Sequence, residues 1–250
     1  MDAEIMQKIV TAISEHKELW DCITRLDAGT GTYNDVDSIA ELIGDQIADC
    51  LATEYSGELL EAYTEVGHEL ISMMGAQAQQ NLNDAARIGI KPMTTKYPRA
   101  RVKSLAEEIA LVDEEMVPDE IKNAVPSLML EMVDAIVKYN ADFQAKAGLR
   151  PVIVRTWSGS YPSHDTKRTD WCHDLAGTYN YGDEPGRVYA RHKGCRCKVE
   201  YYPSKDAKGR ITALERGEVD RSGVLWNTKA ETLDARIRAM ARRTARENEK

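Results

Sequence analysis

Apolar residues recur at three- and four-residue steps through the first 148 residues, and this period predicts a series of amphipathic helices. A Gly/Thr-rich break at 27–32 ends the first apolar stripe, and Pro92 and Pro98 bracket a connector. After the connector, the pattern predicts a helix around 105–112, another around 118–125 and a final long helix over 129–143. The region 1–148 is therefore expected to be helical almost throughout.

One helical stretch departs from this pattern. Residues 76–86 are polar and rich in Ala and Gln, with few apolar positions to face a core. We expect this part of the helix to continue into solvent or to contact a partner.

The pattern changes at Gly148. Val152–Val154 is a short β-branched run and Lys198–Tyr202 alternates like a strand, while glycines and prolines crowd the sequence between them. So few apolar residues give a poor core, which a bound metal would help to stabilise. The predicted fold is mainly α: a helical region 1–148 for docking or assembly, a compact α+β module 149–203, and a linker with a charged helical tail at 204–250.

Composition narrows the class of protein. A net charge of −8 argues against general nucleic-acid binding, since no uniformly basic surface is available. No run of 18 apolar residues is present, so no segment is expected to span a membrane. An odd cysteine count of five fits a reducing compartment, and we expect assembly in a cytoplasm.

Metal-ligating residues are concentrated in the module. Three of the five cysteines and two of the five histidines lie between positions 172 and 197. Cys172, His192, Cys195 and Cys197 form a donor set suited to a tetrahedral structural zinc ion, and Gly194 permits a tight turn before the Cys-x-Cys pair. His173 competes with His192, but neighbouring residues often point apart.

Two other readings of the cysteines stay open. Cys172 could form a disulfide with Cys195 or Cys197, although the expected compartment disfavours it. The cysteines could also be simple buried thiols, which pack like small apolar side chains. None of the three readings requires catalysis.

The same residues carry a family resemblance. The segments Trp171–Tyr179 and Arg191–Tyr201 resemble the C-terminal module of phage minor head proteins, the head-morphogenesis family of tailed phages. That module follows a helical region and ends in His-x-x-Cys-Arg-Cys, which His192–Cys197 matches here; the resemblance covers roughly 150–202. Many relatives have Cys-x-x-Cys at the first position, whereas this chain has Thr169 ahead of Cys172. The lost ligand makes His192 more necessary to a tetrahedral site.

The resemblance implies a virion protein of low copy number at the portal or the inner capsid surface, acting in head assembly or in DNA packaging or ejection. Its expected partner is the portal or the major capsid protein, engaged mainly through the N-terminal helices. A local group of basic residues could also touch packaged DNA non-specifically through phosphates. These residues are Arg187, Arg191, Lys193, Arg196 and Lys198.

Enzyme signatures are missing from the sequence. No P-loop, Gly-x-Ser-x-Gly, His-Glu-x-x-His, dinucleotide or deaminase pattern occurs. The alternative is a small metal-dependent nuclease or processing enzyme, suggested by acidic residues and histidines between 164 and 174, although such residues are more often turn and cap residues. We expect a protein that is not an enzyme. The residues behind the alternative are His164, Asp165, Asp170, His173 and Asp174.

Overall fold

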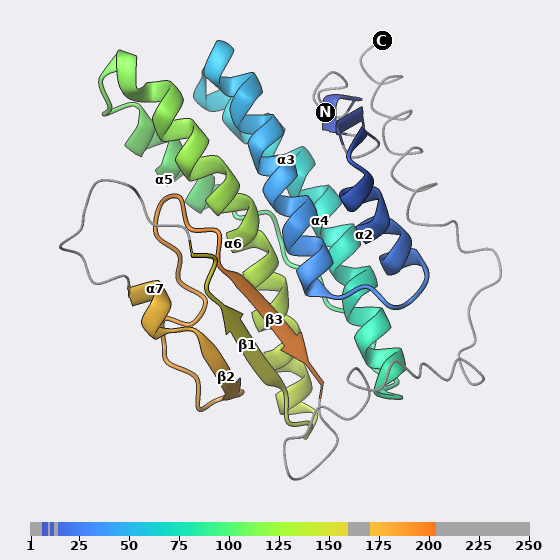
Figure 1. Ribbon diagram of the computed structural model, residues 1–250. Helices are drawn as coiled ribbons and strands as arrows, with labels where there is room; N and C mark the ends of the chain where they lie inside the picture. Colours follow the sequence, from blue (N-terminus) through green and yellow to red (C-terminus); the bar gives the residue numbers. More distant parts are fainter. Residues whose placement is uncertain (1–6, 10, 13–14, 160–170, 204–250) are drawn as a thin grey trace.

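Long helices form most of the molecule, as the apolar periodicity predicts (Figure 1). The computed structural model describes residues 7–9, 11–12, 15–159 and 171–203. Within them, no helix is both long enough and apolar enough to cross a membrane. The helices are α2 (Lys17–Asp27), α3 (Tyr33–Thr53), α4 (Gly57–Ala85), α5 (Arg99–Ile109) and α6 (Val117–Lys146), with a 3-10 turn at Glu114–Met116 before α6.

Helix boundaries follow local chemistry. The predicted break at 27–32 is confirmed, and Gly29 adopts a φ of +78° there, which glycine tolerates best. Thr32 then caps α3, since its hydroxyl accepts from the backbone N–H of Asn34 and the Asp35 carboxylate accepts from the N–H of Thr32. Ser56 caps α4 by accepting from the N–H of Leu59.

Helix α6 differs from the prediction. The sequence predicts two helices, around 118–125 and over 129–143, but one helix of 30 residues includes both and carries Pro126 inside it. Proline has no backbone N–H, so Pro126 cannot donate a hydrogen bond to the preceding turn of the helix. Packing against another helix compensates for the lost hydrogen bond. Gly44 of α3 lies against it so closely that a Cβ on Gly44 would come within 2.4 Å of the Pro126 Cα. Helices α3 and α6 therefore meet at this glycine and proline.

The prediction for residues 76–86 is wrong. Gln79, Asn81 and Asn83 of this stretch are buried rather than exposed to solvent or a partner. Their amides are satisfied inside the protein, and such buried networks are stable when every member has a partner. Gln79 accepts from the Tyr33 hydroxyl at 2.9 Å, Asn81 donates to the Leu26 carbonyl at 2.9 Å, and Asn83 accepts from Gln144 at 2.7 Å.

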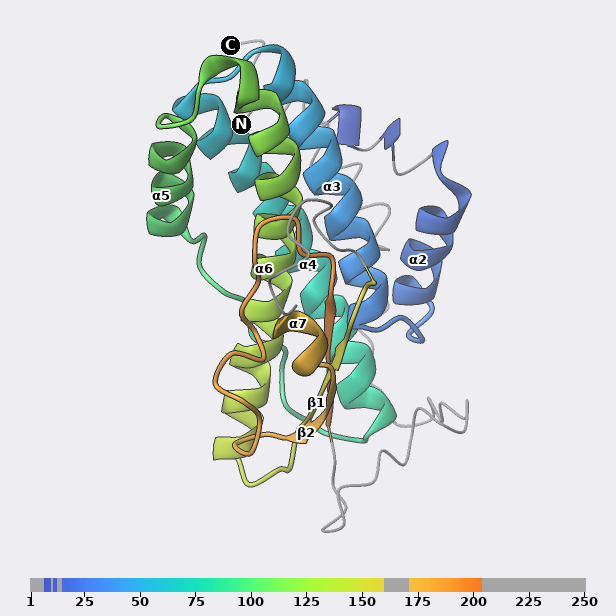
Figure 2. The same ribbon diagram turned by 60° about the vertical axis from the view of Figure 1, so that its left-hand side comes forward.

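A three-stranded antiparallel sheet follows α6, in the order β2-β1-β3. The predicted strands are confirmed as β1 (Val152–Thr156) and β3 (Lys198–Tyr202), and the sequence did not predict β2 (Gly177–Asn180) or the short helix α7 (Trp171–Asp174). In the central strand, Ile153 lies opposite Tyr179 of β2 and Tyr201 of β3. The sheet lies beside α6 and α3, and α7 lies at its outer side (Figures 1 and 2).

The sheet and the helices share a hydrophobic core. Ile153, Val199 and Tyr201 are fully buried and belong to the same cluster as the apolar residues of α3, α4 and α6. A second, smaller cluster consists of Cys172, Cys195 and Cys197, with Trp157 and Trp171 packed against it. The module is thus attached to the helices through its strands and carries a core of its own around the cysteines. The predicted tail at 204–250 lies outside the described residues.

Candidate metal centre

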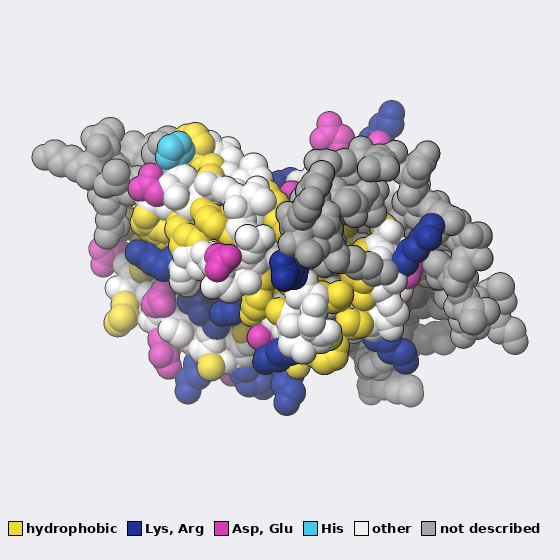
Figure 3. Space-filling view, turned by 90° about the horizontal axis from the view of Figure 1, so that it is seen from below, with side chains coloured by type: hydrophobic (Ala, Val, Ile, Leu, Met, Phe, Trp, Pro, Cys, Tyr) yellow, Lys and Arg dark blue, Asp and Glu magenta, His cyan; other side chains and the backbone are white. Residues whose placement is uncertain are grey.

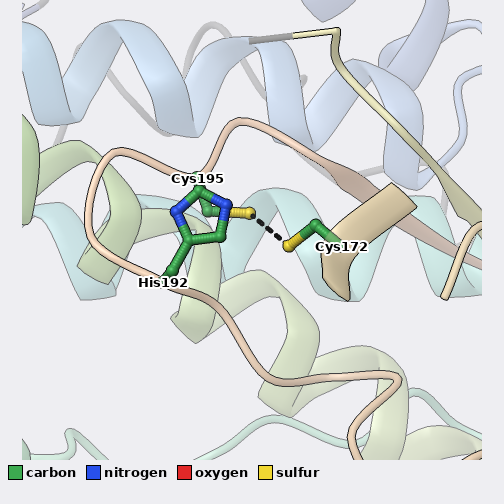
Figure 4. A group of neighbouring side chains, drawn as sticks. All are labelled: Cys172, His192 and Cys195. Atoms are coloured by element: carbon green, nitrogen blue, oxygen red, sulfur yellow. Dashed lines mark hydrogen bonds between the residues drawn. The ribbon is translucent and has the colours of Figure 1, made fainter. Parts of the chain in front are cut away.

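The proposed ligands come from two separate segments of the module. Cys172 lies in α7, whereas His192 and Cys195 lie in the long connection from β2 to β3 (Figure 4). Cys197 directly precedes β3. The fold therefore brings residues that are more than 20 positions apart in the sequence to one place beside α6.

A tight turn sets the spacing of His192 and Cys195. The N–H of Cys195 donates to the His192 carbonyl at 3.0 Å, and Gly194 adopts a φ of +73°. The Gly194 N–H donates to the Asn123 carbonyl of α6 at 3.1 Å, which attaches the turn to the helix. This confirms the turn that Gly194 predicts, and it brings both side chains to the same side.

The donor atoms lie at distances suited to one metal ion. The ligand atoms of Cys172, His192 and Cys195 all lie within 4.8 Å of one another. The sulfurs of Cys172 and Cys195 are 3.7 Å apart, and a tetrahedral ion with Zn–S bonds of about 2.3 Å would place two sulfurs about 3.8 Å apart. The same distance is too long for a disulfide, and all five cysteines are free.

Cys197 completes the group of sulfurs. Hydrogen bonds with the thiols of Cys172 and Cys195 lower the pKa of Cys197, and the bond with Cys172 has the larger effect. The hydrogen bond with Cys195 instead raises the pKa of Cys172. Cys197 thus packs beside the two other cysteines, but it is not one of the three residues whose ligand atoms all lie within 4.8 Å of one another. All three residues are at most 1% exposed.

His192 is the histidine that faces the cysteines. Its Nδ1 lies 2.8 Å from the Lys193 carbonyl, which can only accept, so Nδ1 carries the proton and Nε2 keeps the lone pair that binds metal. The Trp171 ring packs edge-on against the imidazole at 5.8 Å. His173 packs on Trp157 instead and its side chain is 61% exposed, so it is not part of the group.

Arg155 lies directly against the sulfurs. This residue of β1 is 1% exposed, and its Nη2 is 3.2 Å from the Cys172 sulfur and 3.8 Å from the Cys195 sulfur. Its Nη1 donates to the Val188 carbonyl. The sequence interpretation missed Arg155, although strand alternation places it on the same face as buried Ile153. The sequence did carry one sign of its importance, namely a charged residue at a position that strand alternation places on the buried face.

A buried ion pair joins the candidate metal centre to α6. Arg191 donates to both carboxylate oxygens of Asp134, at 2.6 and 2.8 Å, and its side chain is fully buried. The same guanidinium donates to the Cys197 carbonyl. One arginine thus connects the helix to the segment that carries the ligands. Asp134 was also missed, because a lone acidic residue in a helix gives no sign that it is buried.

The basic residues of the module are engaged within the protein. Arg196 pairs with Asp45 at 2.9 Å and Glu41 at 3.3 Å, and Lys193 pairs with Glu120. Lys198 donates to Asn34 and Ser38 of α3, and Arg187 stacks 4.3 Å over Trp171. Positive and negative side chains are also interspersed on the face seen in Figure 3. Among the described residues, most of the positive charge beside the candidate metal centre is therefore engaged within the protein.

The residues behind the nuclease alternative do not form a site among the described residues. His173 and Asp174 are exposed and lie 3.5 Å from each other, and neither belongs to the group that could hold an ion. His164, Asp165 and Asp170 lie outside the described residues.

Asp37 is a buried carboxyl group near the ion pair. It is fully buried in α3, and neither of its oxygens has a hydrogen-bond partner. Burial raises its pKa well above the usual value, although Arg191 and Lys198 nearby oppose this; Asp134 and Glu200 raise the pKa further. The carboxyl is therefore more stable in the neutral form in the folded protein than in the unfolded chain.

We expect the Asp37→Asn variant to flatten the pH dependence of stability. Because the folded pKa is raised, the wild-type protein keeps its full stability below the unfolded pKa and loses it as the pH rises towards the folded pKa. Urea unfolding from pH 4 to pH 8 should show wild-type stability falling relative to the variant. Asp49→Asn, an exposed substitution on the same helix, should follow the wild-type curve. Parallel curves for wild type and Asp37→Asn would contradict the buried-acid interpretation.

Comparison with known proteins adds no further information. No family model, no curated protein and no solved structure matches this chain. The described residues show a mainly helical protein with a small antiparallel sheet, in which Cys172, His192 and Cys195 form a group that could bind a metal ion.

Proposed function

We propose that Cys172, His192, Cys195 and Cys197 bind one structural zinc ion. The convergence of three thiols and one imidazole from two segments of the module supports this proposal. Three sulfurs and one nitrogen are a common ligand set of structural zinc, and zinc binding to such modules contributes directly to folding. The ion would link α7 to the start of β3, and Arg191 and Gly194 would transmit that constraint to α6.

The surroundings support a structural role for the ion rather than a catalytic one. A structural zinc has four protein ligands, whereas a catalytic zinc keeps one position open for water or substrate. The three cysteines are buried, with Trp157 and Trp171 packed against them. Because the proposed ligands use all four positions, the ion would have no position at which to activate a water molecule.

We further propose that the protein is a structural minor head protein of a tailed phage and not an enzyme. The support is the resemblance of Trp171–Tyr179 and Arg191–Tyr201 to that family, together with the positions of the matching residues. Cys172, Cys195 and Cys197 build the metal centre, and Arg191 and Tyr201 attach the module to the helices. The positions that match the phage family are therefore those that hold the module together and attach it to the helices. The expected partner is the portal or the major capsid protein, engaged through the helices of 1–148.

Mass spectrometry of purified phage particles tests the virion assignment. We expect peptides of this chain at low copy number in DNA-filled heads, at a constant ratio to the portal protein. Empty heads made without the gene provide the negative control. Peptides that occur only in the cell lysate would contradict a place in the virion, and metal-dependent DNA cleavage by the pure protein would favour the nuclease alternative.

A further inference from the structure

A buried arginine without an acidic partner requires an explanation. Arg155 is the largest of the fully buried side chains, and it occupies the central strand of the sheet. Buried arginines in proteins are normally paired with a carboxylate, because an unpaired charge is costly away from water. Among the described residues no Asp or Glu forms an ion pair with Arg155, and the nearby Asp134 carboxylate is already engaged by Arg191.

The guanidinium is directed at sulfur. Its Nη2 contacts the sulfurs of Cys172 and Cys195 at 3.2 and 3.8 Å, and Nη1 is held by the Val188 carbonyl. The remaining nitrogen, Nε, is buried and has no hydrogen-bond partner. The strand therefore fixes the positive charge beside two of the proposed ligands and in contact with neither solvent nor a carboxylate.

A metal complex with a net negative charge would balance the Arg155 charge at these distances. Three thiolates, one neutral imidazole and one divalent ion carry a single net negative charge. The Asp134–Arg191 pair is neutral as a unit, so one positive charge is needed nearby to make the buried region neutral. Arg155 supplies it.

We propose that Arg155 is the counter-cation of the metal centre, a positioning residue that favours a three-thiolate complex with a divalent, sulfur-binding ion. This inference rests on the zinc proposal and specifies the net charge of the zinc complex. The N–H groups of Arg155 donate to the thiolate sulfurs and orient them, as groups around a metal site commonly do for its ligands. A monovalent ion on the same three thiolates would leave a net negative charge and should bind less favourably in place of zinc.

Zinc competition with a chromophoric chelator tests this role in the full-length protein. We expect Arg155→Met to weaken zinc binding by about 10- to 100-fold, the usual effect of losing a group that supports the ligands. Arg155→Lys keeps the charge and should recover most of the affinity. Arg187→Met is the matched control, because Arg187 stacks on Trp171 beside the cluster but is exposed. Its zinc affinity should equal that of the wild type.

Cobalt spectra provide a readout that a general loss of stability would not change. In Arg155→Met loaded with excess Co²⁺ we expect weaker sulfur-to-cobalt charge-transfer bands than in wild type and Arg155→Lys, because fewer thiolates bind. Wild-type affinity and spectrum in Arg155→Met, or equal losses in the Lys and Met variants, would overturn the counter-cation role while leaving the zinc proposal intact. Failure of the wild-type protein to bind either metal would overturn both.

Discussion

Cys195→Ser should abolish tight zinc binding and unfold the segment around the metal centre. Cys195 is one of the four proposed ligands, and its carbonyl also accepts from the Ser127 hydroxyl of α6 at 3.4 Å. Loss of a structural metal is among the few single changes that cost about 4 kcal/mol or more. Hydrogen exchange should show that residues 171–197 lose protection, while α3, α4 and α6 and the strand β3 that packs on them keep theirs.

The helices are expected to survive because their core does not depend on the cysteines. The apolar residues of α3, α4 and α6 pack with one another, and the cysteine cluster is separate from them. Far-UV circular dichroism should therefore stay close to that of the wild type at 25 °C. Cys50→Ser, on α3 and outside the cluster, provides the control. A collapse of the helical signal in Cys195→Ser would mean that the helical region and the module unfold as one unit.

Asp134→Ala should destabilise the protein by about 3–5 kcal/mol, because it leaves the buried Arg191 charge without its partner. The ion pair lies where the metal-binding segment meets α6, so the loss should also weaken the attachment of the module. Urea denaturation followed by tryptophan fluorescence would measure it, since Trp157 and Trp171 lie beside the cluster.

A second acidic residue of α6 makes a matched control. Glu131 also pairs with an arginine, Arg101 at 3.1 Å, but the two side chains are 26% and 42% exposed. Exposed pairs contribute about 0–1 kcal/mol, so Glu131→Ala should have a small effect. Equal losses in Asp134→Ala and Glu131→Ala would show that the burial of the Arg191 pair has no special importance.

Much of this architecture could be predicted from the sequence, because the period of apolar residues reports directly on helices and strands. The break before Thr32, the strands at 152–156 and 198–202 and the turn at Gly194 all have local signals. The four ligands could be proposed because thiols and imidazoles are rare and were concentrated in one segment.

The errors have a common physical cause. In each of them, the structure of a residue depends on contacts with residues far away in the sequence. Pro126 stays inside a helix because Gly44 of another helix lies against it, and no local rule contains that contact. Gln79 and Asn83 are buried because distant tyrosine and glutamine side chains satisfy their amides. Arg155 and Asp134 are likewise defined by partners far along the chain, the sulfurs and Arg191.

The metal content of the purified protein tests the central claim most directly. Protein prepared without chelator under reducing conditions should contain one zinc per chain by elemental analysis, and the Cys172→Ser, Cys195→Ser and Cys197→Ser variants should each contain much less. His192→Ala should also lose metal, whereas His173→Ala should retain one equivalent, since His192 faces the sulfurs and His173 packs on Trp157 instead. Metal-free wild-type protein that is folded, with its thiols reduced and unable to take up added zinc, would contradict a zinc-binding structural module.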